Sequence, residues 1–133
     1  MNGVLVILVL LHLGMIVVPL DKALPENEIE SSIIRSEATC VIFDKKYLDV
    51  FNKLKTQNKS KLKHFICMDF ENDVDNVLSY NKLLENGKTQ ISNGNISYDN
   101  VVIDNNSMTI MLFTSRYYCY FKNCNAFTSQ RLC

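Results

Sequence analysis

The chain has 133 residues, which is enough for one domain with a modest hydrophobic core. Its 14 basic and 14 acidic residues balance to a formal net charge of zero. This balance argues against a nucleic-acid-binding protein and against electrostatic docking on an anionic membrane, because both need an excess of positive charge on one face. We therefore predict no nucleic-acid partner.

The first 20 residues have the pattern of a secretory signal peptide. Residues 4–20 carry no charge, and His12 is their one polar residue. An apolar run directly after the initiator methionine is typical of the hydrophobic core of such a leader. No Lys or Arg precedes the run, and no small-x-small motif marks its end. The sequence therefore does not define one cleavage site, and cleavage is expected near Leu20 or Ala23. The alternative is an uncleaved anchor, since the run is at the short limit of a membrane span.

Residues 21–37 are acidic and contain only isolated apolar positions. This composition predicts a flexible acidic arm or a short propeptide. Residues 38–133 are then expected to form a single secreted domain.

The first half of this domain shows two strand-like and two helix-like segments. Residues 39–43 and 64–70 are rich in β-branched and aromatic side chains, which predicts two buried strands. Apolar side chains at helical spacing predict a helix over residues 45–57 after an N-cap at Asp44. A second helix is expected from a cap at Asn72 or Asp73 to Asn86-Gly87. Its expected apolar face consists of Val74, Val77, Leu78 and Leu84.

Beyond Gly87 the pattern changes to β. Residues 101–103 and 108–113 predict a hairpin, and residues 116–121 predict a final aromatic strand. Strands joined through a helix are normally parallel and lie in one sheet. The complete order therefore predicts an α+β fold with a small mixed sheet, β-α-β-α followed by antiparallel β-strands, stapled by disulfides.

Five cysteines follow the leader: Cys40, Cys67, Cys119, Cys124 and Cys133. In an oxidising compartment they are expected to pair, and an odd number leaves one over. Cys40 and Cys67 are the preferred pair, because both lie in strands that are expected to be neighbours. Cys119 or Cys124 would bond within the C-terminal segment, which leaves Cys133 for an intermolecular disulfide and a covalent homodimer. Alternatively, Cys133 closes a loop onto Cys124.

Three Asn-x-Ser sequons begin at Asn58, Asn95 and Asn105. Each lies in a polar stretch that is typical of a loop or turn, where a glycan can be attached without burial. Together with the leader, they predict a glycoprotein.

Candidate chemistry is sparse. His64 is the single histidine after the leader, and no nucleophile motif accompanies it. The carboxylates of residues 69–75 lack the glycine and terminal glutamate of a calcium loop, so they are interpreted as a helix start. The cysteines lack paired zinc-ligand spacing. We predict no catalytic, cofactor-binding or metal-binding residue. The lysines of residues 53–63 are either a polyanion-binding patch or a solvated helix end.

Tyr117, Tyr118 and Tyr120 form a candidate contact surface, because tyrosine offers a large rigid face with a polar tip. The alternative is that some of them pack in the core around Cys119. The sequence as a whole predicts a secreted, extracellular, non-enzymatic effector or binding module that contacts an extracellular protein or a glycan. Two alternatives stay open: a small secreted hydrolase that uses His64, and a membrane-anchored ectodomain with an uncleaved leader.

Overall fold

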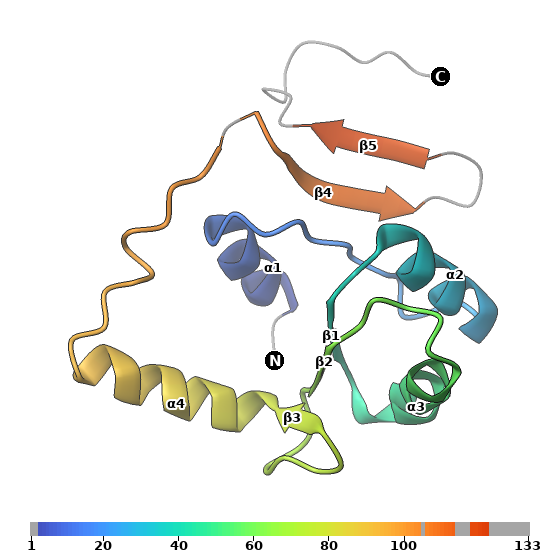
Figure 1. Ribbon diagram of the computed structural model, residues 1–133, viewed down its shortest axis with the longest axis horizontal. Coiled ribbons are helices and arrows are strands. Elements are labelled where there is room, and N and C mark those ends of the chain that lie inside the picture. The colour runs from blue at the N-terminus through green and yellow to red at the C-terminus, as the bar shows by residue number, and fades with distance from the viewer. Residues whose placement is uncertain (1–2, 105, 114–117, 123–133) are drawn as a thin grey trace. The chain divides into compact units, whose positions relative to one another are not determined.

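The computed structural model describes residues 3–104, 106–113 and 118–122. The chain divides into two compact units. One unit consists of residues 23–96, and the other combines residues 1–22 with residues 97–133. Each unit has its own sheet (Figure 1).

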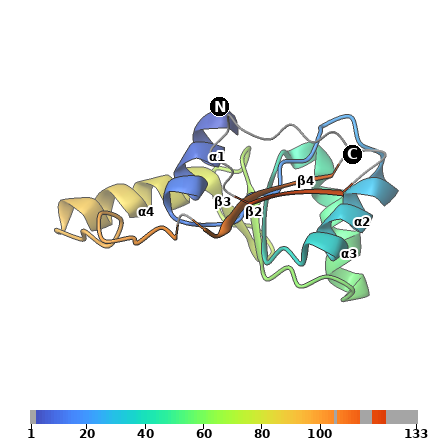
Figure 2. The same ribbon diagram turned by 90° about the horizontal axis from the view of Figure 1, so that it is seen from above.

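The unit of residues 23–96 is built on a three-stranded sheet in which every neighbouring pair is parallel. Its strands, in spatial order, are β1 (Cys40–Phe43), β2 (His64–Cys67) and β3 (Val77–Ser79). Its helices are α2 (Glu26–Ser36), the 3-10 turn η1 (Lys45–Tyr47), α3 (Leu48–Gln57) and α4 (Tyr80–Ser92). Two views at right angles place α2 and α3 next to each other, whereas α4 runs away from them (Figures 1 and 2).

The core of this unit lies where α2 and α3 meet the sheet. Ile29 and Ile33 of α2 are buried one turn apart, and the ring of Phe43 in β1 lies 4.5 Å from the ring of Phe51 in α3. Burial of apolar surface of this kind is the main favourable term in folding. Residues 26–36, which were expected to belong to a flexible arm, therefore form a helix because Ile29 and Ile33 give it an apolar face.

A tight turn replaces the predicted start of the second helix. Val74 and Val77 exchange two backbone hydrogen bonds of 3.0 and 2.7 Å, and the intervening Asp75 and Asn76 both have positive φ. Two central residues with positive φ define a type I′ turn, in which Asp and Asn are favoured. Residues 77–79 then pair with β2, so the helix begins at Tyr80 and continues through Gly87 to Ser92.

The second unit contains α1 (Gly3–His12) and a two-stranded antiparallel sheet of β4 (Met108–Phe113) and β5 (Tyr118–Lys122). Val17 adds a short parallel bridge to β4 at Ile110. Its N–H donates to the carbonyl of Thr109 at 2.8 Å, and its carbonyl accepts from the N–H of Met111 at 2.9 Å. The predicted hairpin of residues 101–103 with 108–113 is wrong, because β4 pairs with β5 and residues 101–103 form no strand.

The predicted mixed, disulfide-stapled sheet is also wrong. The parallel strands β1, β2 and β3 form one sheet, and the antiparallel pair β4 and β5 forms another. Cys40 and Cys67 are both free thiols. Cys40 lies opposite His64, whereas Cys67 lies opposite Phe43. This register separates the two cysteines by about 10 Å along the strands, well beyond the 4.4–6.8 Å between Cα atoms that a disulfide requires.

Candidate functional site

The two cysteines of the sheet differ in accessibility. Cys40 is exposed at the start of the edge strand β1, whereas Cys67 is 0% exposed. Neighbouring atoms exclude water from part of the Cys40 side chain, and this desolvation raises the pKa of its thiol above the ordinary value of 9.0. Cys119 is opposite Leu112 in the β4–β5 ladder. The side chain of Cys119, together with Cys124 and Cys133, lies outside the described residues.

Two of the three sequon asparagines lie at helix ends. Asn58 is the C-cap of α3, is exposed and has a left-handed backbone with φ of 49°. Asn95 is exposed just after α4, and its side-chain amide donates to Gln90 at 3.2 Å. Asn105 lies outside the described residues. Asn58 and Asn95 are therefore placed where a glycan could be attached without burial, and their occupancy stays a prediction.

His64 lies at the amino end of β2 and is exposed. The carboxylates of Asp69 and Asp73 follow the carboxyl end of the same strand. A catalytic histidine needs an orienting group within hydrogen-bond reach. The fold places His64 and these two carboxylates at opposite ends of β2, so it does not bring them together.

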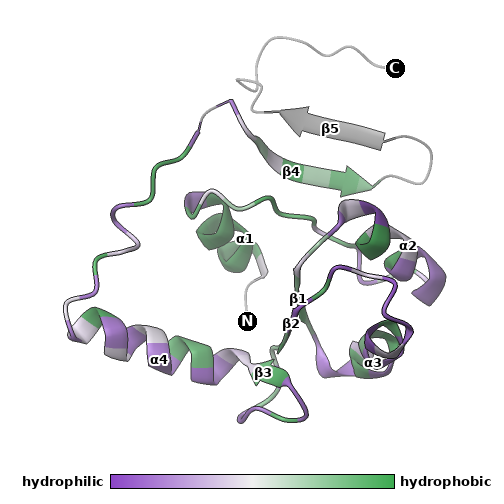
Figure 3. Cartoon of the chain, viewed as in Figure 1, coloured by the Kyte–Doolittle hydropathy of each residue, from purple (hydrophilic) through white to green (hydrophobic). Residues whose placement is uncertain are grey.

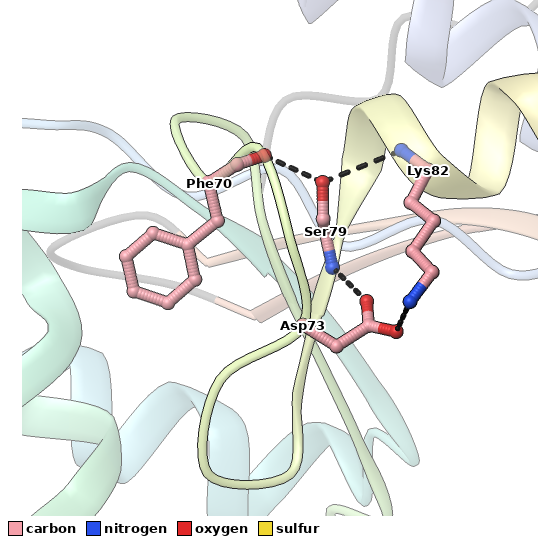
Figure 4. Close-up of polar contacts among 4 residues, drawn as sticks. All are labelled: Phe70, Asp73, Ser79 and Lys82. Carbon is pink, nitrogen blue, oxygen red and sulfur yellow. Dashed lines mark hydrogen bonds and ion pairs between the residues drawn. The ribbon is translucent and has the colours of Figure 1, made fainter.

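A cluster of polar groups fixes the start of α4 (Figure 4). Ser79 is the N-cap: its Oγ accepts from the backbone N–H of Lys82 at 3.3 Å and donates to the carbonyl of Phe70. The backbone N–H of Ser79 donates to Asp73 Oδ1 at 2.8 Å, and Lys82 Nζ donates to Asp73 Oδ2 at 2.8 Å. These bonds tie the loop after β2 to the first turn of α4.

The hydrogen bond from Lys82 and the backbone bond from Ser79 lower the pKa of Asp73 below its ordinary value of 3.8. The carboxylate is thus ionised at neutral pH and used for structure. A second carboxylate acts in the same way, since Asp69 Oδ2 accepts from the backbone N–H of Lys45 at 2.7 Å. Open parallel sheets commonly bind ligands at the carboxyl ends of their strands. Here these acidic side chains bond to the protein itself.

The lysines that suggested a polyanion site are partly engaged. Lys53 pairs with Glu26 at 3.3 Å and Lys61 pairs with Glu37 at 2.7 Å. Lys55 donates to the carbonyl of Asp75 at 3.2 Å. These exposed pairs contribute little stability, but they reduce the positive field of the segment.

Apolar and polar residues alternate along α4 (Figure 3). All residues of α4 are described, and none of its side chains is buried. Apolar and small residues nevertheless recur at i, i+3, i+4, i+7 and i+11, which puts them on one face. This apolar stripe of α4 consists of Tyr80, Leu83, Leu84, Gly87 and Ile91. Leu84 is 47% exposed and Ile91 is 71% exposed.

Sequence reasoning found Leu84 but missed most of this stripe. Gly87 was interpreted as the end of the helix, and Ile91 was assigned to a β region. In the structure Gly87 lies inside α4. The available signal was Ser79, a strong N-cap residue placed directly before the helical spacing begins.

A shallow, open depression on α3 is lined by Asp49, Asn52, Lys53 and Thr56. Within the described ranges, no group of three His, Cys, Asp or Glu side chains could hold a metal ion. Tyr118 and Tyr120 lie in β5, but their side chains and the whole of Tyr117 are outside the description.

Among the residues that the structure covers, no helix is both long and apolar enough to cross a membrane. No protein-family model matches this chain, and no curated protein matches it.

Proposed function

We propose that this chain is a secreted, glycosylated binding module that contacts an extracellular protein through the apolar stripe of α4. The observation that carries the proposal is that α4 presents Leu84 and Ile91 to solvent while burying none of its own side chains. Contiguous apolar surface on a soluble protein is typical of an interaction site. The leader pattern and the sequons support the extracellular setting.

The chemistry of the stripe favours a protein partner over a glycan. Leu83, Leu84 and Ile91 are aliphatic, and they are suited to an apolar groove on another protein. Gly87 lies among them without a side chain, and apart from its chain neighbours and the adjacent helix backbone no heavy atom is within 4 Å of the place where a Cβ would stand. A partner backbone can therefore approach the helix closely at this point.

The polar cluster at the start of α4 gives this surface a fixed position. Ser79 caps the helix, and Lys82 is held by Asp73 on the side away from the stripe. A preorganised contact surface loses less conformational freedom on binding. We therefore assign Ser79, Asp73 and Lys82 a positioning role in a non-enzymatic module.

A cell-surface binding assay tests the proposal. Fluorescently labelled secreted protein is applied to cells of the source organism, and wild type is compared with Ile91→Asp. The matched control is Val102→Asp, because Val102 is 94% exposed but lies outside the stripe. We expect Ile91→Asp to reduce binding at least tenfold and Val102→Asp to leave it unchanged. Protease treatment of the cells should abolish binding, whereas glycosidase treatment should not.

Three outcomes contradict the proposal. Equal binding by wild type and Ile91→Asp would exclude the apolar stripe as the contact surface. Loss of binding after glycosidase treatment alone would indicate a glycan partner. A dimer that Ile91→Asp dissociates in sedimentation velocity would mean that a second copy of this chain occupies the stripe. That dimer is distinguishable from the predicted covalent homodimer, because Cys133→Ser would leave it intact.

A further inference from the structure

The first 20 residues fall into two parts with different relations to the rest of their unit. The described residues of α1 include no buried side chain, and Val4, Leu5 and Leu8 are largely exposed. Val17, five residues beyond the end of α1, is only 7% exposed and holds two backbone hydrogen bonds to β4. The stretch that was predicted to be one removable leader therefore contains a segment that belongs to the folded unit.

The boundary between these parts is marked by Gly14. Its N–H donates to the carbonyl of Leu11 at 3.0 Å, and the N–H of Met15 donates to the carbonyl of Leu10 at 3.1 Å. This pair of bonds is a Schellman motif, which requires a residue with left-handed backbone just past the helix. Gly14 meets that requirement with φ of 70°, and glycine adopts it without strain. Helix α1 therefore ends at His12, and residues 15–20 are not helical.

We propose that the leader is cleaved between Gly14 and Met15, and that residues 15–20 remain in the mature protein as an edge segment on β4. This inference rests on the proposed secretion. The 10 residues of α1 match the length of a leader's hydrophobic core, about 7–15 residues, and Gly14 supplies the small residue that normally ends a leader. His12 stands at the position two before it, where a second small residue is usual.

Cleavage is hydrolysis of one peptide bond. A water oxygen bonds to the Gly14 carbonyl carbon and the bond from this carbon to the Met15 nitrogen breaks. Gly14 leaves as a carboxylate, and the Met15 nitrogen takes up both protons of the water to become the new, positively charged amino terminus. Gly14 and Met15 are both exposed, whereas Val17 is buried.

A cut near Leu20 or Ala23 has a different consequence. It would remove Val17 and with it two backbone hydrogen bonds to β4. The edge of β4 would then offer the Met111 N–H to other chains, which is the arrangement that natural sheets avoid. A cut after Gly14 removes only α1, whose contact with the rest of the unit includes the stacking of His12 on Tyr98 at 5.2 Å.

The test is the amino terminus of the secreted protein. The full chain is expressed in secreting cells, and protein from the medium is deglycosylated and examined by intact mass and N-terminal sequencing. We expect Met15 as the first residue. A first residue of Asp21 or Leu24, or an intact leader on secreted protein, overturns this cleavage site but leaves secretion standing. A chain that never reaches the medium contradicts the proposed secretion and this inference with it.

A matched pair of variants locates the cut independently. Gly14→Leu removes the small residue at the proposed site, and we expect at least a tenfold loss of protein that begins at Met15. Gly3→Leu makes the same change at the other end of α1, where a Cβ would have no described neighbour within 4 Å apart from adjacent residues and the local helix backbone, and it should be processed like wild type. Normal processing of Gly14→Leu would overturn the proposal.

Discussion

The backbone N–H of Ser79 donates to the carboxylate of Asp73, six residues earlier in the chain, at 2.8 Å. Ser79 ends β3 and caps α4, so this bond lies where the strand becomes the helix. Ser79 is fully buried. The Asp73 side chain, which pairs with Lys82, is partly exposed to solvent. The bond therefore joins the loop after β2 to the junction between β3 and α4.

Ser79→Ala should lower the free energy of unfolding by about 1–3 kcal/mol, because it removes the cap of α4 and the donor to the Phe70 carbonyl. Urea unfolding followed by circular dichroism measures this change. The control is Ser92→Ala, since the exposed Ser92 hydroxyl only donates to Lys88 within the same helix. Its effect should stay within about 0.5 kcal/mol. Equal stability of the two variants would exclude a structural role for the Ser79 side chain.

Asp73→Asn should destabilise the protein at neutral pH and have less effect in acid. Because the bonds from Lys82 and Ser79 lower the pKa of Asp73, its ionised form stabilises the folded state above the ordinary value of 3.8. That contribution disappears as the pH falls through the lowered pKa of the folded state. Urea midpoints of wild type and variant should therefore converge in acid. A difference that is constant from pH 7 to pH 3 would contradict the assignment.

Cys40 should react with iodoacetamide in the native protein, and Cys67 should react only after unfolding. Cys40 is exposed and Cys67 is completely buried. Because the pKa of Cys40 is raised above 9.0, its labelling rate should still be rising at that pH, where much of the thiol remains protonated. Peptide mass spectrometry identifies the labelled residue. A Cys40–Cys67 disulfide in non-reduced peptide maps would contradict the strand register.

Val17→Asp should destabilise the secreted protein by about 2–4 kcal/mol, because the charge would replace a buried apolar side chain. Ile16→Asp is the matched control. The Ile16 side chain is 52% exposed, so this position should tolerate the charge. Thermal unfolding of the two purified variants makes the comparison. Identical melting temperatures would show that Val17 is not part of the mature fold.

Asn58 should carry an N-linked glycan in protein from a secreting cell. Ser60→Ala destroys the sequon but keeps Asn58 as the left-handed C-cap of α3, so it should remove one glycan without loss of stability. Asn58→Gln should remove the same glycan and also lower the melting temperature, since glutamine tolerates positive φ less well. Electrophoresis with and without N-glycosidase detects the glycan. Unchanged mobility of Ser60→Ala would mean that the site is unoccupied.

Local pattern was sufficient for several elements. Residues 40–43 and 64–67 are strands, and residues 48–57 are a helix, as their side-chain periodicity predicts. Each of these signals depends on residues within one short stretch, because β-branched runs favour strands and i, i+3, i+4 spacing favours helices. For the same reason, Val74, Val77 and Leu78 predict a helix that does not form at these positions. Their helical spacing also fits a turn followed by a short strand.

The sequence by itself determined where β1, β2 and α3 form and which asparagines stand in Asn-x-Ser sequons. The tertiary structure decided which strands are neighbours, and therefore that Cys40 and Cys67 are too far apart to bond. It also decided that Val77–Ser79 is a strand, because backbone pairing with β2 outweighs its helical spacing. Pairing, register and burial depend on residues distant in the chain, and no local pattern specifies them. The same dependence gave Val17 a β-bridge to Ile110 of β4, although Val17 lies in a run that resembles a leader.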